Sequence, residues 1–301
     1  MINNLECNRC QKKIIKKQAF TFHRPDLDVE SILCESCFWH ESSKVFDSFP
    51  ERYDIARPGY PDALIEEVIE FSQIPADGEI LEIGSGTGKA TECFAKKGYH
   101  ILCIEPGENL ARLAREKLPH HPNLSIENTS FEAWELVKKS RFHLAVAAQA
   151  FHWIDPNIGY AKIFKALKPE GTLALFWNMY DQANDSLFPR FQKVYRKFAP
   201  QLVYENYIVE DIIQDRSELI LASGYFHHMR VKRFSWSEIY STQRYLTLLE
   251  TYSDHVILSN STKEHLYQAI ADLIESEGGY ICRPYMAVLY LANKRLSSIT
   301  D

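Results

Sequence analysis

The chain has 301 residues, 46% of them apolar, and a formal net charge of −6 at neutral pH. A chain of this size buries one large core and has room for a small additional module. The negative charge argues against a protein that holds nucleic acid by bulk electrostatic attraction. No apolar run approaches the roughly 20 residues that span a bilayer, and the first ten residues lack the apolar segment of a signal peptide. We therefore expect a cytoplasmic protein with no membrane partner.

Two Cys-x-x-Cys pairs mark the beginning of the chain: Cys7 with Cys10, and Cys34 with Cys37. Without a secretion signal these thiols are expected to be reduced, so paired cysteines point to a metal. Four thiolates on two short turns satisfy the tetrahedral preference of zinc. We predict a zinc-ribbon module over residues 1–42, with structural zinc supplying much of its folding energy. A redox pair or four free thiols are the alternatives.

Residues 43–301 are predicted to form one domain in which strands and helices alternate, as in a parallel α/β sheet. The expected helices cover residues 64–71, 89–97 and 160–167. The expected strands cover residues 80–83, 100–104, 124–127, 142–149 and 172–177, followed by strand-like segments at 226–234 and 286–294. Two long helical tracts, at 188–198 and 238–277, are expected to form a lid.

The most informative segment runs from Ile80 to Gly88 and reads Ile-Leu-Glu-Ile-Gly-Ser-Gly-Thr-Gly. A dinucleotide fingerprint needs a glycine or alanine where Lys89 stands, and a phosphate-binding loop needs Ser or Thr where Ala90 stands. The alternating glycines instead let the backbone approach a bulky ligand without forming a pyrophosphate site. A tight turn without a ligand is the alternative.

An acid ends each of the first two strands. Glu82 stands at the end of the first strand. Glu105, next to Pro106, follows the second strand and lies 23 residues after Glu82. An acid at this position is suited to accept hydrogen bonds from both hydroxyls of a ribose. The two segments together predict a nucleoside-containing cofactor at the carboxyl ends of the strands.

These residues resemble the class I S-adenosylmethionine-dependent methyltransferases, and in particular the group related to trans-aconitate and UbiE-like methyltransferases. The resemblance covers about residues 44 to 295. Its motifs are Phe46-Asp47, Tyr53 to Pro61, Ser130-Phe131-Glu132, Ala148 to Trp153, Tyr245 to Ser253, Gly278-Gly279 and Val288 to Ala292.

The resemblance implies an α/β fold with a doubly wound, mostly parallel seven-stranded sheet, closed by an antiparallel pair at 226–234 and 286–294. It places the helical lid at roughly 181–222 and 236–280. The implied cofactor is S-adenosylmethionine. Its predicted binding residues are Tyr53, Arg57, Glu82, Gly84, Ser85, Gly86, Gly88, Glu105, Pro106, Ser130, Phe131 and Gln149.

By the same resemblance, the glycine turn approaches the methionyl and ribose portions, Glu105 holds the ribose, and Ser130 with Phe131 flank the adenine. Many relatives carry an aspartate where this chain has Ser130. Tyr53 and Arg57 either reach the cofactor carboxylate or only fix their helix.

Gln149 is expected below the transferred methyl group, and His152 is the candidate general base because it is titratable and close to that point. His152 as a simple pocket wall is the alternative.

The expected acceptor is a small molecule, methylated at the oxygen of a carboxylate or hydroxyl. The fourth-strand segment lacks the Asn-Pro-Pro-Tyr pattern associated with methylation of base and glutamine amino groups, which favours an oxygen or a carbon target. The aromatic residues that could line the pocket of the acceptor are Trp177, Tyr180, Trp236, Tyr252 and Tyr285.

Two further hypotheses are an RNA base methyltransferase and a cofactor-binding protein without turnover. In the first, the basic ribbon residues Arg9, Lys12, Lys13, Lys16 and Lys17 would grip RNA, although such a patch also forms an ordinary solvated face. The oligomeric state is not indicated.

Overall fold

The computed structural model describes the backbone of residues 4–6, 13–15, 19–24 and 29–34, and the backbone and side chains of residues 47–203, 208–256 and 258–296. The chain divides into two units, each assembled from segments that are distant in sequence. The sheet unit contains residues 58–185, 206–238 and 283–301, and the helical unit contains residues 1–57, 186–205 and 239–282.

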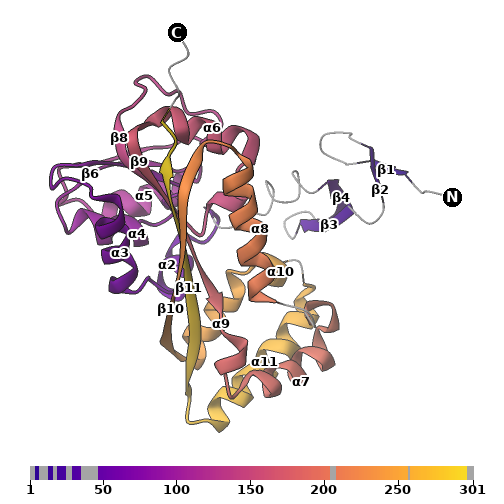
Figure 1. The fold of residues 1–301 in the computed structure, drawn as a ribbon. Helices are drawn as coiled ribbons and strands as arrows, with labels where there is room; N and C mark the ends of the chain where they lie inside the picture. The colour runs from indigo at the N-terminus through magenta and orange to yellow at the C-terminus, as the bar shows by residue number, and fades with distance from the viewer. Residues whose placement is uncertain are drawn as a thin grey trace. The chain divides into compact units, whose positions relative to one another are not determined.

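A mostly parallel sheet of seven strands organises the sheet unit, in the order β10-β11-β9-β8-β5-β6-β7. Pairing is parallel from β7 through β9, and β11 is antiparallel to β9. In Figure 1 the long β10 (orange) and β11 (yellow) run side by side. The expected α/β fold is therefore confirmed. The strands are β5 (Glu79–Ile83), β6 (His100–Ile104), β7 (Leu124–Glu127), β8 (Phe142–Ala148), β9 (Leu167–Tyr180), β10 (Phe226–Ser241) and β11 (Tyr280–Lys294).

Successive residues of each strand point to opposite faces, so the sheet divides two hydrophobic clusters. Ile80 belongs to the cluster that contains α3 (Asp62–Ser72) and α4 (Lys89–Ala95). Leu81 belongs to the cluster that contains α6 (Pro156–Ala166) and α8 (Val209–Ala222). Full burial of each such aliphatic side chain is worth about 1.5–3 kcal/mol. In the chain, β6 and β7 are connected by a further helix, α5 (Glu108–Lys117).

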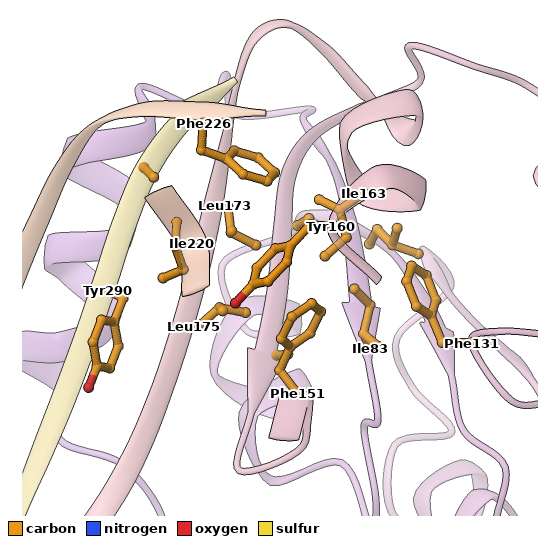
Figure 2. Close-up of a cluster of buried hydrophobic side chains, with 14 of the residues drawn as sticks. Ile83, Phe131, Phe151, Tyr160, Ile163, Leu173, Leu175, Ile220, Phe226 and Tyr290 are labelled. Carbon is orange, nitrogen blue, oxygen red and sulfur yellow. The ribbon is translucent and has the colours of Figure 1, made fainter. Parts of the chain in front are cut away.

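The cluster on the α6 and α8 face is rich in aromatic rings. Figure 2 shows Tyr160 and Phe151 lying together beside Leu175, with their ring centroids 4.9 Å apart. Tyr290 reaches into the same cluster from β11. This packing holds the loop after β8, which carries Phe151, against the sheet.

Strand β10 is longer than predicted and corrects one expected boundary. The helical tract expected from Glu238 begins only after Ser241, because residues 238–241 continue the strand. Phe234, Trp236 and Tyr240 stand at alternate positions and are less exposed than their neighbours, which is the period of a strand. The side-chain alternation therefore outweighs the helix propensity of this segment.

Five helices of the helical unit are described: α2 (Pro50–Ala56), α7 (Phe188–Phe198), α9 (Thr242–Glu250), α10 (Ser253–Val256) and α11 (Asn260–Ser276). Helix α7 packs against α11, and α2 against α9. Ser241 and Ser259 cap α9 and α11 by accepting hydrogen bonds from backbone N–H groups. Among all described residues, no helix has the length and apolarity needed to cross a membrane.

Two short antiparallel hairpins are described near the start of the chain. Strand β1 (Asn4–Glu6) pairs with β2 (Lys13–Ile15), and β3 (Ala19–Arg24) pairs with β4 (Val29–Cys34). Strands β1 and β4 also contact each other. The first Cys-x-x-Cys pair directly follows β1 in the chain, and the second begins with the last residue of β4.

Candidate functional site

The predicted glycine turn lies at the carboxyl end of β5. The backbone N–H of Gly84 donates to the carbonyl of Ile104 at 2.8 Å, which ties the turn to β6. Gly84 has a φ of 69°, and a Cβ atom at this position would stand 2.4 Å from the Cβ of Ala150. Only glycine therefore allows the loop after β8 to lie directly on the turn.

Gly86 is the open position of the turn. Its φ is 56°, and a Cβ atom there would meet no atom of the described residues within 4 Å. Its backbone N–H donates to Oε2 of Glu105 at 2.7 Å. The space beside Gly86 thus has a peptide backbone on one side and a carboxylate at its edge, which suits a ligand with hydroxyl groups.

Glu105 joins the turns that follow β5 and β6. Its Oε1 accepts a hydrogen bond from the backbone N–H of Gly107 at 2.8 Å, across the intervening Pro106. Asn128 donates to the carbonyls of Glu105 and Pro106 at 2.9 and 3.1 Å and fixes the same segment. A carboxylate has about four acceptor positions, so bonds to backbone amides are compatible with further bonds to ribose hydroxyls.

Glu82 is a second acid at this edge, and it is buried, with 1% of its surface exposed. Burial raises the pKa of Glu82 to about 7, although hydrogen bonds from Thr91 and Cys103 oppose the rise. Among the described residues, its Oε1 has no hydrogen-bond partner. A buried carboxyl oxygen of this kind suits a cationic ligand group, because pairing offsets the cost of burying the charge.

A lysine of helix α6 fixes the segment that carries Ser130 and Phe131. The Nζ of Lys162 donates to the carbonyls of Phe131, Glu132 and Trp134 at 2.9, 2.9 and 2.7 Å. The ring of Phe131 is buried in the core and stacks on Trp134. The side chain of Phe131 therefore supports this loop from the core, and Ser130 is partly exposed.

Gln149 follows β8 in a left-handed backbone conformation, with a φ of 58°. Its backbone N–H donates to the carbonyl of Phe176 at 2.9 Å, and its side-chain amide donates to the carbonyl of Asn178 at 3.2 Å. Both bonds tie Gln149 to β9. Left-handed non-glycine residues are uncommon and concentrate at functional sites.

His152 lies in the short 3₁₀ turn Phe151–Trp153 that continues from this loop. The indole N–H of Trp177 donates to its Nδ1 at 3.1 Å. Ala150, which contacts the glycine turn, stands two residues before His152 in the chain.

Tyr53 and Arg57 belong to the helical unit. The guanidinium of Arg57 donates to the hydroxyl of Thr251 at 2.9 Å and to its carbonyl at 2.7 Å. It also lies over the rings of Tyr53 and Tyr252, at 5.2 and 4.5 Å from their centroids. These contacts support the role of fixing helix α2. Contact with a cofactor stays a prediction for both residues.

The predicted zinc ligands lie where no side chain is described. Cys7, Cys10 and Cys37 fall outside the described residues, and only the backbone of Cys34 is described. Within the described part of the chain, no group of three or more His, Cys, Asp or Glu side chains could hold a metal ion. Zinc therefore stays a prediction.

The structure brings most of the predicted cofactor residues to one edge of the sheet unit. Sequence reasoning missed two residues that fix their loops, Asn128 and Lys162, because a polar side chain that bonds to distant carbonyls leaves no local signal. The residues at this edge are Glu82, Gly84, Ser85, Gly86, Gly88, Glu105, Pro106, Ser130 and Gln149.

Residues 80–171 match a family model described as a methyltransferase domain. An uncharacterized methyltransferase-like protein of Schizosaccharomyces pombe is 28% identical over 240 residues, which cover 77% of this chain and 87% of that protein. A probable S-adenosylmethionine-dependent methyltransferase of Saccharomyces cerevisiae is 25% identical over 60% of this chain and 61% of its own length.

A solved structure supports the same fold. A structure described as that of a putative type II methyltransferase from Anaeromyxobacter dehalogenans superposes with a TM-score of 0.55 and 22% identity, over 79% of this chain and 96% of that one. The glycine turn, the two strand-end acids and the matched domain agree with one another. The chain is an enzyme, an S-adenosylmethionine-dependent methyltransferase of the class I fold.

Proposed function

We propose that the enzyme methylates a small molecule at oxygen, on a carboxylate or a hydroxyl. The main support is the open space beside Gly86, which Glu105 borders. In the same turn, Gly84 contacts the loop that carries Gln149 and His152. In this arrangement Gly86 and Glu105 hold the cofactor, and the acceptor lies beside it, next to Gln149 and His152.

Each part of the cofactor meets a group of suitable chemistry in this proposal. Glu105 accepts hydrogen bonds from the ribose hydroxyls, and the amides of the glycine turn lie against the methionyl portion. Glu82 has a buried carboxyl oxygen without a partner among the described residues, and in the proposal the positive charge of the cofactor compensates it. Ser130 borders the adenine.

The cofactor supplies an electrophilic methyl group on a positively charged sulfur. The chain's own residues then have three tasks: to orient the acceptor oxygen, to exclude water and to keep the reacting groups in line, which accounts for large rate gains in intramolecular reactions. The absence of an Asn-Pro-Pro-Tyr segment at residues 149–152 favours oxygen over an amide or base nitrogen.

We also propose structural zinc on Cys7, Cys10, Cys34 and Cys37. The order of the hairpins supports it, since the two pairs begin at the ends of β1 and β4, and these strands contact each other. Two Cys-x-x-Cys pairs that begin at the ends of contacting strands would supply the tetrahedral sulfur set that zinc prefers.

The cofactor assignment predicts that Glu105→Ala weakens S-adenosylmethionine binding at least about tenfold, because a charge-assisted hydrogen bond is worth roughly 1.5–3 kcal/mol. Calorimetric titration measures this. Glu127→Ala is the matched control, since Glu127 is an exposed acid at the end of the neighbouring strand β7. Unchanged affinity in a folded Glu105→Ala protein would contradict the assignment.

The burial of Glu82 predicts a pH dependence of stability in the cofactor-free enzyme. The folded state holds the Glu82 proton up to a pKa of about 7, and the unfolded state holds it only up to the ordinary glutamate pKa of 4.5. The free energy of unfolding therefore falls as pH rises through this window, by roughly 3 kcal/mol, and levels off above it.

Urea unfolding of Glu82→Gln between pH 4.5 and 8 checks this, because the variant lacks the titrating group and should lose that fall. Glu66→Gln, an exposed acid on α3, should keep it. Saturating cofactor should flatten the wild-type profile, since its positive charge lowers the pKa of Glu82. Identical profiles for both variants would refute the burial argument.

The acceptor proposal predicts turnover with carboxylic acids or alcohols and none with RNA. Release of S-adenosylhomocysteine is measured over a panel of carboxylic acids, phenols and RNA, with the full chain and with residues 1–42 removed. Methylation confined to RNA, lost on neutralising Lys12, Lys13, Lys16 and Lys17, would replace the proposal by the RNA hypothesis.

The zinc proposal predicts about one zinc per chain after purification under reducing conditions. Elemental analysis should show that Cys7→Ser with Cys10→Ser removes this zinc. Cys282→Ser serves as the control because Cys282 is exposed and lies outside the two pairs. A wild-type zinc content near zero would rule the site out.

A further inference from the structure

Trp177 determines which nitrogen of His152 carries the proton. An indole N–H can only donate, so the lone pair at Nδ1 of His152 is occupied by its hydrogen bond with Trp177 at 3.1 Å. The neutral imidazole must then carry its proton on Nε2. The nitrogen that faces away from Trp177 is an N–H donor and not a proton acceptor.

Trp177 is itself firmly held. It is 4% exposed, the guanidinium of Arg216 on α8 lies 3.9 Å from its ring centroid, and the ring of Tyr290 meets it edge-on at 5.6 Å. The ring of Tyr290 lies in the core cluster of Figure 2. Because contacts on several sides fix the indole, it constrains the imidazole rather than following it.

A general-base role does not fit this arrangement. Neutral His152 has no lone pair at Nε2, and protonation at Nδ1 would break the bond with Trp177 and remove the acceptor of the buried indole N–H. Arg216 adds a positive charge over the ring of Trp177, and the hydroxyls of Tyr290 and Tyr160 are titratable groups of the same cluster. Burial raises the pKa of both tyrosines, so they stay neutral.

We propose that His152 holds an anionic acceptor as a fixed Nε2–H donor, and that the acceptor is therefore a carboxylate. This rests on the proposed methylation at oxygen and narrows its substrate class. The His152 side chain is exposed, and two residues earlier Ala150 contacts the glycine turn, so the proposal places the donor beside the acceptor.

The step balances without a base. The N–H of His152 holds one carboxylate oxygen, and a lone pair of the other oxygen forms the new oxygen–methyl bond. The methyl–sulfur bond breaks, and its electron pair remains on sulfur, which becomes neutral. No proton is released, because a carboxylate is already ionised near neutral pH. A hydroxyl acceptor would instead need a group that removes its proton.

The tautomer is tested directly by ¹⁵N NMR of the histidine-labelled, cofactor-bound enzyme, which needs no acceptor. His152 should show the Nε2–H tautomer, and Trp177→Phe should convert it to a mixture. His143 is the internal control, since its Nδ1 accepts from the backbone N–H of Glu79 at 3.0 Å and its Nε2 lies 2.8 Å from Nζ of Lys168, so its ¹⁵N shifts should be the same in both proteins. A proton on Nδ1 of His152 in the wild type would overturn the proposal.

Two substitutions of the exposed His152 test the role in turnover, even where Trp177→Phe fails to fold. His152→Gln places an amide N–H near the position of Nε2, whereas His152→Asn places it near Nδ1. We expect kcat/KM for a carboxylic acid to stay within about threefold in the first and to fall at least tenfold in the second. Equal losses in both variants would overturn the donor role.

The pH profile separates a donor from a base. A base loses activity on protonation, whereas a donor keeps its N–H, so kcat/KM should not decline through the histidine range. An acid limb that is present in the wild type and absent in His152→Gln would restore the general base. If the Nε2–H tautomer is found and every carboxylic acid is inert, the proposed acceptor class is wrong and the tautomer assignment stands.

Discussion

The carboxylate of Glu105 accepts hydrogen bonds from the backbone amides of Gly86 and Gly107, and so joins the turns after β5 and β6. Each turn connects its strand to the helix that follows, and no regular secondary structure aligns one turn with the other. Hydrogen bonds to a charged group are stronger than those between neutral groups, which makes the carboxylate an effective clamp. The same group that binds the ribose in our proposal therefore also shapes the turn that receives it.

Glu82 and Glu105 show how environment divides two acids at one edge. Glu105 is buried, but both of its carboxyl oxygens accept hydrogen bonds from backbone N–H groups. Glu82 is buried with one carboxyl oxygen that lacks a partner among the described residues, and its pKa is raised to about 7. Cofactor-free enzyme thus keeps an unfavourable group in its core, and in our proposal the positive charge of the cofactor stabilises it. Stability and affinity are linked through that one side chain.

Sequence patterns predicted the fold where the signal is local. Strands β6 and β7 begin and end where the apolar runs predicted, and the strand-end acids lie at the same edge of the sheet. The end of β10 and the burial of the Phe131 ring were not predicted, because both depend on tertiary packing. The same holds for Lys162, whose three carbonyl partners lie about 30 residues earlier in the chain. The cofactor roles of the site residues, and the zinc ligands, stay predictions.

The two halves of the site are encoded differently, which explains why the cofactor was easier to infer than the acceptor. Most of the predicted cofactor residues lie within residues 82–131, and they depend on glycines and acids next to the strands that present them. The acceptor half depends on a chain of contacts from Arg216 on α8 to Trp177 on β9 and then to His152. A histidine near a transfer point indicates a base in the sequence alone. Its partner, 25 residues away, makes it a donor, so the preference for an anionic acceptor arises from packing on the α8 face of the sheet.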